Sequence, residues 1–203
     1  MLRMSNSGVM SIGCALRRSV SWLSRDPLRL APLPAFFDDG HEPICTLFES
    51  ASLVTPHGKY LDQRFIDFLA ENFESIDDMH WRKFEGLSAE FFEREGARVE
   101  VGPGSNDDGV DLRVWWPDDD QEKPAAVLVQ CKREKSAVDK VTLKALYADV
   151  LHERASSGLI VTTQRLSPGA ETTRTARSYP IDAADRATLR IWIDKMRKNR
   201  TDI

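Results

Sequence analysis

Two polar residues end an apolar stretch of the chain at a spacing that could do chemistry. Gln130 and Lys132 are two positions apart. Residues at that spacing on a β-strand point to the same side, so both side chains project together while Cys131 points away. Residues 106–109, Asn-Asp-Asp-Gly, predict a tight turn that leads into Asp111. If the two strands that carry these residues pair as a hairpin, Asp111 lies beside Gln130.

These residue types can build a site for phosphodiester hydrolysis. A hard divalent cation prefers oxygen ligands, which the Asp111 carboxylate, the Gln130 amide oxygen and the main-chain carbonyl of Cys131 could supply. Such a cation polarises a phosphate and lowers the pKa of a bound water. The ammonium group of Lys132 can orient that water and offset charge in the transition state. Asp, Gln and Lys are nevertheless common at strand ends, so the spacing alone is not specific.

A further carboxylate is a candidate for the same site. On the helix predicted over residues 77–95, Glu85 falls at the edge of the apolar arc, whereas Glu90 and Glu93 fall on the solvent side. A carboxylate at the edge of the core needs a polar partner. The metal site is one such partner, and an ion pair is the other, so the sequence leaves both open. Candidates for the ion pair are Arg82, Lys83 and Arg133.

The elements that must position these residues follow from the apolar periodicity. It predicts helices over 61–73 and 77–95, strands over 97–101, 110–116 and 125–132, a helix over 138–153, a strand over 158–163, a short helix capped by Ser167, and a helix over 186–198. Ser75 or Asp77 is the predicted N-cap of the second helix, and Gly96 ends it. The order of elements predicts a mixed α/β sandwich.

One helix has its core face predicted residue by residue. For the helix over 138–153, the apolar side chains are expected to pack inward. They are Val138, Val141, Leu143, Leu146, Val150 and Leu151.

Composition excludes several classes of protein. The chain has 203 residues, of which 41% are hydrophobic and 30% charged, and no apolar run is long enough to span a membrane. Its three cysteines are isolated and its four histidines have no ligand spacing, so neither a disulfide framework nor a zinc site is indicated. A net charge of −4 argues against a general nucleic-acid coat protein but not against a nuclease. A cytoplasmic location is expected.

Three regions are predicted along the chain. Residues 1–57 are rich in Ser, Pro and Arg, which predicts an extension that is poorly ordered or only partly packed. Residues 58–78 form a linking helix, and residues 79–203 form the main domain. Acidic residues crowd 38–78 and basic residues crowd 165–200.

Four segments occur in a recognisable order. They are Phe84-Glu85-Gly86-Leu87, Asp108-Gly109-Val110-Asp111-Leu112, Val129-Gln130-Cys131-Lys132-Arg133 and Gly158-Leu159-Ile160-Val161-Thr162-Thr163. Together they resemble the Mrr-like restriction endonuclease domain, in the Gln-x-Lys branch of the PD-(D/E)xK nuclease superfamily. The resemblance covers residues 79–196. It implies a restriction-endonuclease-like three-layer α/β/α core, with a mixed sheet flanked by helices.

The resemblance also implies roles for individual residues. Asp111 matches the family's motif aspartate, Gln130 and Lys132 its Gln-x-Lys pair, and Glu85 its helix glutamate. These four are the expected catalytic residues. Asp111, Gln130 and the Cys131 carbonyl are the expected ligands of Mg²⁺, for which Mn²⁺ could substitute.

Contacts to DNA are expected next to this site, from Arg133, Lys135 and Thr163. The basic residues could follow a DNA backbone together with Lys140 and Lys144, or they could form a solvated helix entrance. Thr163 could contact phosphate or simply pack at the end of its strand. The sequence leaves these alternatives open.

We therefore expect a magnesium-dependent endonuclease that hydrolyses DNA, in restriction or defence against foreign DNA that includes modified DNA. The family's Asp-Gly-Gly turn is here Asp107-Asp108-Gly109, so a carboxylate replaces a glycine. The alternative is thus a catalytically silent module that binds DNA or another protein, with the acidic segment as a docking surface or DNA mimic. The expected partner is DNA and not a membrane. A homodimer and a separate DNA-reading or defence-system partner stay open.

Overall fold

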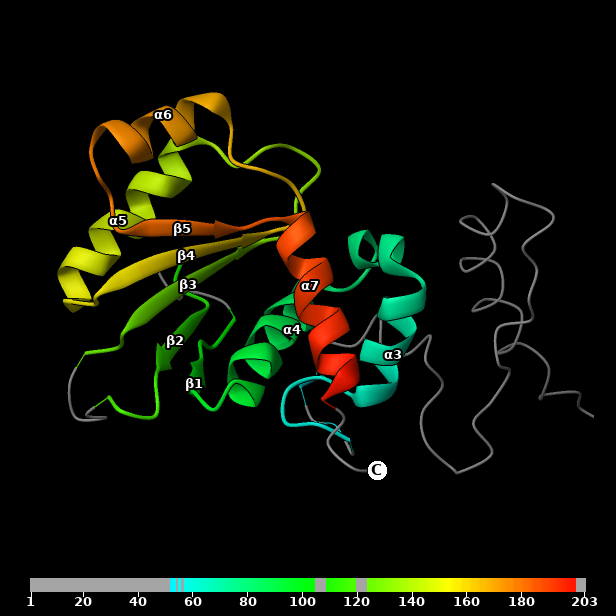
Figure 1. The fold of residues 1–203 in the computed structure, drawn as a ribbon. Coiled ribbons are helices and arrows are strands. Elements are labelled where there is room, and N and C mark those ends of the chain that lie inside the picture. The colour runs from blue at the N-terminus through cyan, green and yellow to red at the C-terminus, as the bar shows by residue number, and fades with distance from the viewer. Residues whose placement is uncertain (1–51, 54, 56, 105–108, 120–123, 200–203) are drawn as a thin grey trace, which may run out of the picture. The chain divides into compact units, whose positions relative to one another are not determined.

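The computed structural model describes residues 52–53, 55, 57–104, 109–119 and 124–199. Residues Leu47–Ile203 cluster as one compact unit, and Figure 1 shows its described residues in colour. Nearly all of the predicted extension over 1–57, and the turn residues Asp107 and Asp108, lie outside the described residues. The predicted division at residues 57 and 78 stays a prediction.

A five-stranded mixed sheet forms the centre of this unit. Its strands lie in the order β1-β2-β3-β4-β5, in which β1, β2 and β3 pair antiparallel and β3, β4 and β5 pair parallel. The bounds are β1 (Arg98–Val101), β2 (Leu112–Trp115), β3 (Val127–Lys132), β4 (Ser157–Thr162) and β5 (Ile181–Ala184). The four strands predicted from the sequence are confirmed. Strand β5 was not predicted.

Helices cover both faces of the sheet. They are α3 (Gln63–Glu71), the short 3₁₀ helix η1 (Phe73–Asp77), α4 (Trp81–Arg94), α5 (Lys140–Glu153), α6 (Pro168–Ala176) and α7 (Arg186–Lys198). In Figure 1, α5 and α6 lie on one side of the sheet, and α3, α4 and α7 lie on the other. This arrangement is the predicted three-layer α/β/α core. None of the helices in the described part of the chain combines the length and apolar character needed to cross a membrane.

The sequence predicts the N-cap of α6 correctly and that of α4 wrongly. Ser167 caps α6, with its hydroxyl accepting from the Ala170 N–H at 3.2 Å, as predicted. For α4, the predicted caps Ser75 and Asp77 are wrong, because both lie within η1. His80 caps α4 instead, with Nδ1 accepting from the Arg82 N–H at 3.1 Å.

Helix α5 packs on the sheet through part of its predicted face. Leu143, Leu146 and Val150 are buried in one core cluster with side chains of β3 and β4. Val141 and Leu151 are 65% and 60% exposed, so their prediction as core residues is wrong. They fall outside the stripe that the sheet covers, because a single packed sheet buries only about one side of a helix.

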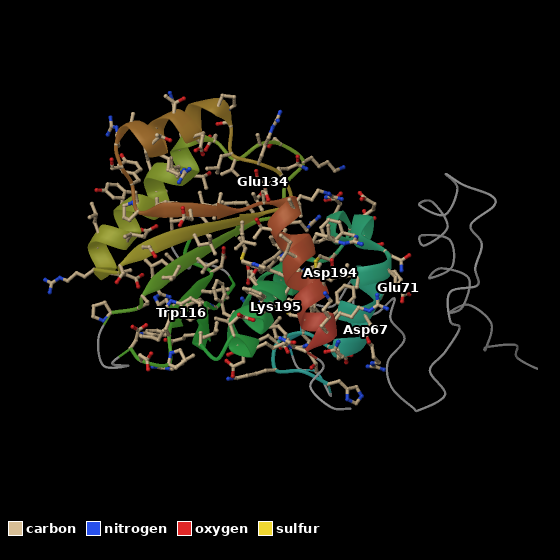
Figure 2. All side chains as sticks on the ribbon, viewed as in Figure 1. Asp67, Glu71, Trp116, Glu134, Asp194 and Lys195 are labelled. Carbon is tan, nitrogen blue, oxygen red and sulfur yellow. The ribbon has the colours of Figure 1, made fainter. Side chains whose placement is uncertain are left out.

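The acidic stretch before α4 is tied to the basic C-terminal helix. Arg186 pairs with Glu74 at 2.5 Å and with Asp77 at 2.8 Å, and Arg197 pairs with Glu71 at 2.7 Å. Figure 2 shows Glu71 on α3 beside α7. Much of the acidic charge that the structure describes is thus matched within the chain, which leaves less of it for a docking surface or DNA mimic.

Candidate active site

A cavity of about 240 Å³ opens where β2 and β3 meet the beginning of α4. The four residues predicted to be catalytic all contribute to its lining. The lining consists of Trp81, Phe84, Glu85, Gly104, Gly109, Asp111, Gln130, Cys131, Lys132 and Arg133. The four predicted residues, which are up to 47 positions apart in the sequence, from 85 to 132, therefore share one site.

Strand pairing fixes the position of Asp111. β2 and β3 form the antiparallel pair expected from the sequence, in a register that sets Leu112 opposite Val129. The Asp111 N–H donates to the Val129 carbonyl at 2.9 Å. Its carboxylate oxygen Oδ2 accepts from the Cys131 N–H at 2.6 Å. Asp111 is thus held beside Gln130 from both its main chain and its side chain.

Gln130 is buried in a way that calls for a further ligand. The residue is only 6% exposed, and its Oε1 has no hydrogen-bond partner among the described residues. A buried acceptor without a partner costs about 1–3 kcal/mol, because it has lost its bonds to water. An oxygen of this kind, in a residue that lines the cavity together with Asp111, suits a cation that binds oxygen.

Gly109 lets the turn approach the Gln130 amide closely. Its φ is +90°, a conformation that disfavours other residues. A Cβ atom at this position would lie 2.8 Å from Gln130 Nε2. A side chain at position 109 would therefore push the amide out of place.

Glu85 satisfies both of the alternatives that the sequence left open. It is 4% exposed, lines the cavity, and forms an ion pair with Arg82 at 2.6 Å between Oε2 and Nη1. Burial at the edge of the apolar arc is as predicted. The ion pair and the site are compatible, because Glu85 lines the cavity together with Asp111 while it is paired with Arg82.

The prediction that Glu90 faces solvent is wrong. It is 2% exposed. Its Oε2 accepts from the N–H groups of Lys59, Tyr60 and Leu61 at 2.9, 2.8 and 3.3 Å. Its Oε1 accepts from Arg94 Nε at 2.8 Å. The cause is the segment before α3, which covers the side of α4 that the helical wheel assigns to solvent.

The Cys131 thiol is hydrogen-bonded to α4 and is not a candidate metal ligand. Its thiol donates to Ser88 Oγ on α4 at 3.6 Å. Burial, and then the nearby Asp111 carboxylate, raise the pKa of the Cys131 thiol well above its usual value. The thiol therefore stays protonated at neutral pH, and the residue offers the site its main-chain carbonyl instead of a thiolate.

The three residues expected to contact DNA have different surroundings. Arg133 lines the cavity, and its Nη1 donates to the Asp77 carbonyl at 2.6 Å, while its Nε is buried without a partner among the described residues. Lys135 is exposed. Thr163 is 2% exposed, and its hydroxyl donates to the Glu134 carbonyl at 3.3 Å. Arg133 is the one of these three that the structure brings to the site.

The donor set fits a small hard cation. Among the residues that the structure describes, no three or more His, Cys, Asp or Glu side chains gather as a metal cluster. The cavity offers instead the carboxylates of Glu85 and Asp111, with an unpaired amide oxygen between strands. Mg²⁺ is commonly bound by one or two carboxylates together with waters and substrate phosphates, so a third acid is not required.

Trp81 is the lining residue whose place the sequence did not predict. The helical pattern assigns it to the apolar face of α4, yet 44% of it is exposed, at the mouth of the cavity. Its position at the first residue of the helix is the signal that was available, because the first turn of a helix often extends past the layer that it packs on.

Comparison with known proteins gives one family. The model of the restriction endonuclease domain Mrr_cat matches residues 76–193, which is more than half of the chain. None of the curated proteins compared with the chain matches it.

Solved structures with a similar chain path are restriction enzymes. One is the MspJI restriction endonuclease in complex with a 27-mer oligonucleotide, with 23% identity and a TM-score of 0.44, covering 67% of this chain and 32% of that one. Another is the DNA modification-dependent restriction endonuclease AspBHI, with 16% identity and a TM-score of 0.45, covering 96% of this chain and 50% of that one. This chain spans a third to a half of the length of these enzymes.

Proposed function

Because this chain belongs to the Mrr_cat restriction endonuclease family, we propose that it is a metal-dependent endonuclease that hydrolyses DNA at the cavity between β2, β3 and α4. One observation carries the proposal. The four residues that match the family's motifs line a single cavity, and one of them, Gln130, holds a buried amide oxygen without a partner among the described residues.

Each of these residues has a separate task in the proposed site. Asp111, Gln130 Oε1 and the Cys131 carbonyl would hold Mg²⁺ or Mn²⁺. When bound, such a cation polarises the phosphate and makes a bound water more acidic. Lys132 orients the attacking water and offsets the charge that develops on the phosphate oxygens. Glu85 accepts hydrogen bonds from water in the cavity.

The charges around the cavity suit a phosphate in the presence of a cation. Glu85 and Asp111 supply negative charge to the lining, and Lys132 and Arg133 supply positive charge. Arg82 adds a positive charge next to Glu85. Local positive charge attracts a polyanion even when the chain as a whole is acidic. Asp111 is held by the Cys131 N–H and by its own main-chain bond to Val129, so the metal-binding end of the site is preorganised.

The biological setting that we propose is restriction or defence against foreign DNA, including modified DNA, in the cytoplasm. Cutting both strands of a duplex requires two sites or two binding events, so a homodimer belongs to the proposal. So does a separate partner or domain that reads the DNA sequence or its modification.

The test is a cleavage assay on methylated and unmethylated plasmid, with Mg²⁺, with Mn²⁺ and with a chelator. We expect cleavage by the full chain only when a divalent cation is present. Lys132→Ala should lower the rate by about 10³-fold, because the group that stabilises transition-state charge is removed. Lys198→Ala is the matched control, since Lys198 is exposed on α7 and does not line the cavity.

Two outcomes would count against the assignment. Cleavage that survives both Lys132→Ala and Asp111→Ala would place the chemistry elsewhere. Binding of DNA without cleavage under every metal condition would indicate a silent DNA-binding module. Thermal unfolding of each variant shows whether a lost activity reflects the site or the fold.

A further inference from the structure

The Trp81 side chain is a large apolar surface at the mouth of the cavity. It begins α4, is 44% exposed, and lines the same cavity as Asp111 and Lys132. The metal-binding and catalytic tasks proposed above make no use of it. Exposing an aromatic ring to water is unfavourable in proportion to its exposed area, so a ligand that covers the ring would gain from doing so.

The ring is held in place from the protein side. Its tip lies against the loop after β1, where a Cβ atom on Gly104 would come within 3.2 Å of Trp81 Cη2 and 3.0 Å of Arg82 Nη1. The ring of His80 lies at 5.1 Å between centroids, tilted by 35°. His80 is itself fixed as the cap of α4. The exposed part of Trp81 is therefore a supported surface and not a free side chain.

Exposure alone does not mark a binding residue, as Trp116 shows. Trp116, labelled in Figure 2, is 38% exposed. Its ring meets that of Phe92 edge-on at 5.9 Å between centroids. It does not line the cavity. Scattered exposed aromatic residues are normal on protein surfaces. What distinguishes Trp81 is its place beside the groups proposed to act on a phosphodiester.

We infer that Trp81 is a stacking surface for the nucleobase next to the phosphate that is cut. The inference rests on the proposed function, because it requires a nucleic acid in the cavity. A phosphate held near Asp111 and Lys132 carries its base within one nucleotide of the cavity mouth, where the indole ring offers a flat partner. Base–aromatic stacking tolerates every base, because each has a π-face.

This geometry specifies a class of substrate. In a DNA duplex each base is already stacked on its neighbours, so stacking on Trp81 requires the base to leave the helix. That cost is smallest for a mismatched or single-stranded nucleotide. The chain should therefore cut DNA faster where the nucleotide beside the cleaved phosphate is mismatched or unpaired than where it is fully paired.

The experiment compares Trp81→Ala, Trp81→Phe and Trp116→Ala with the unmodified chain. Once a cleavage position has been mapped, duplexes carry a single abasic residue at each neighbouring position in turn. On normal DNA, Trp81→Ala should lower kcat/KM roughly 5- to 100-fold, the loss that follows removal of one base-stacking aromatic residue. Trp81→Phe should recover much of this loss, and Trp116→Ala should show none.

The decisive quantity is the ratio of the cleavage rates of the unmodified chain and Trp81→Ala on each substrate. At one abasic position, the unmodified chain and Trp81→Ala should cut at nearly the same rate, because the base that the ring contacts is missing. At every other position the ratio should stay as on normal DNA. A ratio that does not depend on the abasic position would overturn the inference, since a purely structural role for Trp81 would affect all substrates alike.

A binding experiment separates this inference from the proposed function. Lys132→Ala protein, without added metal, is mixed with duplexes that carry the fluorescent base 2-aminopurine at each position in turn. Stacking on Trp81 predicts a fluorescence change at one position that is lost in Lys132→Ala/Trp81→Ala. If the unmodified chain cuts DNA normally but the fluorescence change does not occur, the stacking role alone is overturned. A chain that neither binds nor cuts DNA overturns both the stacking role and the proposed function.

Discussion

Glu85 and Glu90 lie about one and a half turns apart on α4 and are buried to nearly the same extent, at 4% and 2% exposed. Their surroundings differ. Glu90 accepts from three successive main-chain N–H groups and from Arg94, which connects the segment before α3 to the helix. Glu85 pairs with Arg82 and borders a cavity.

The difference shows that burial does not by itself identify a functional carboxylate. Glu90 is a structural anchor, because its partners are main-chain groups that lose their own hydrogen bonds if it is removed. Glu85 lies beside a residue, Gln130, whose buried oxygen has no partner among the described residues. In this helix, the structural carboxylate is the one that binds three main-chain donors of another segment.

The strongest way to test the comparison is to remove the structural carboxylate. Glu90→Ala should lower the free energy of unfolding by about 3–5 kcal/mol, because Arg94 and three main-chain donors lose a buried partner. Urea unfolding measures this. Glu93→Ala is the matched control, since Glu93 forms a more exposed pair with Lys59 and should cost no more than about 1 kcal/mol. Equal losses in the two variants would remove the distinction.

The converse test is Glu85→Gln. We expect the cleavage rate to fall by about 10²-fold, which corresponds to roughly 2.7 kcal/mol in activation free energy, because the amide no longer supplies negative charge to the cavity. The free energy of unfolding should change by less than about 1 kcal/mol, since the amide still accepts from Arg82. A variant that is strongly destabilised yet fully active would make Glu85 a second anchor.

The smallest expected effect is the change in the free energy of unfolding that Gln130→Met causes. The substitution keeps the volume and removes the unpaired buried acceptor, so the free energy of unfolding should stay unchanged or rise by about 1 kcal/mol. Cleavage should be lost at the same time. A fall in stability of more than about 2 kcal/mol would show that the amide is a structural group like Glu90.

The sequence predicts the positions of the candidate site residues better than it predicts the packing of the segments around them. Asp111, Gln130 and Lys132 are placed by strand alternation and by one hairpin, and the register confirms the pairing of Asp111 with the strand of Gln130. The bounds of α7 are also as predicted, because Asp185 caps the helix where its apolar pattern begins. Rules for a single helix, strand or hairpin suffice wherever the position of a residue depends on that element alone.

Other features depend on packing between distant segments, which local rules do not see. The burial of Glu90 depends on main-chain groups about 30 residues away. Strand β5 contains Asp182 and two alanines, which have low β-propensity, and it forms because the edge of β4 is available for parallel pairing. The exposure of Trp81 likewise depends on where the layer beneath α4 ends.

The ion pair between Glu71 on α3 and Arg197 on α7 joins residues that leave the ribosome at very different times. Glu71 and Arg197 are 126 residues apart. At 5–20 residues per second, α3 waits roughly 6–25 s for its partner helix. During synthesis, the apolar side chains of α3 that α7 later covers stay open to water and to other nascent chains. This helical layer is therefore completed only after strands β1 to β5 have been synthesised.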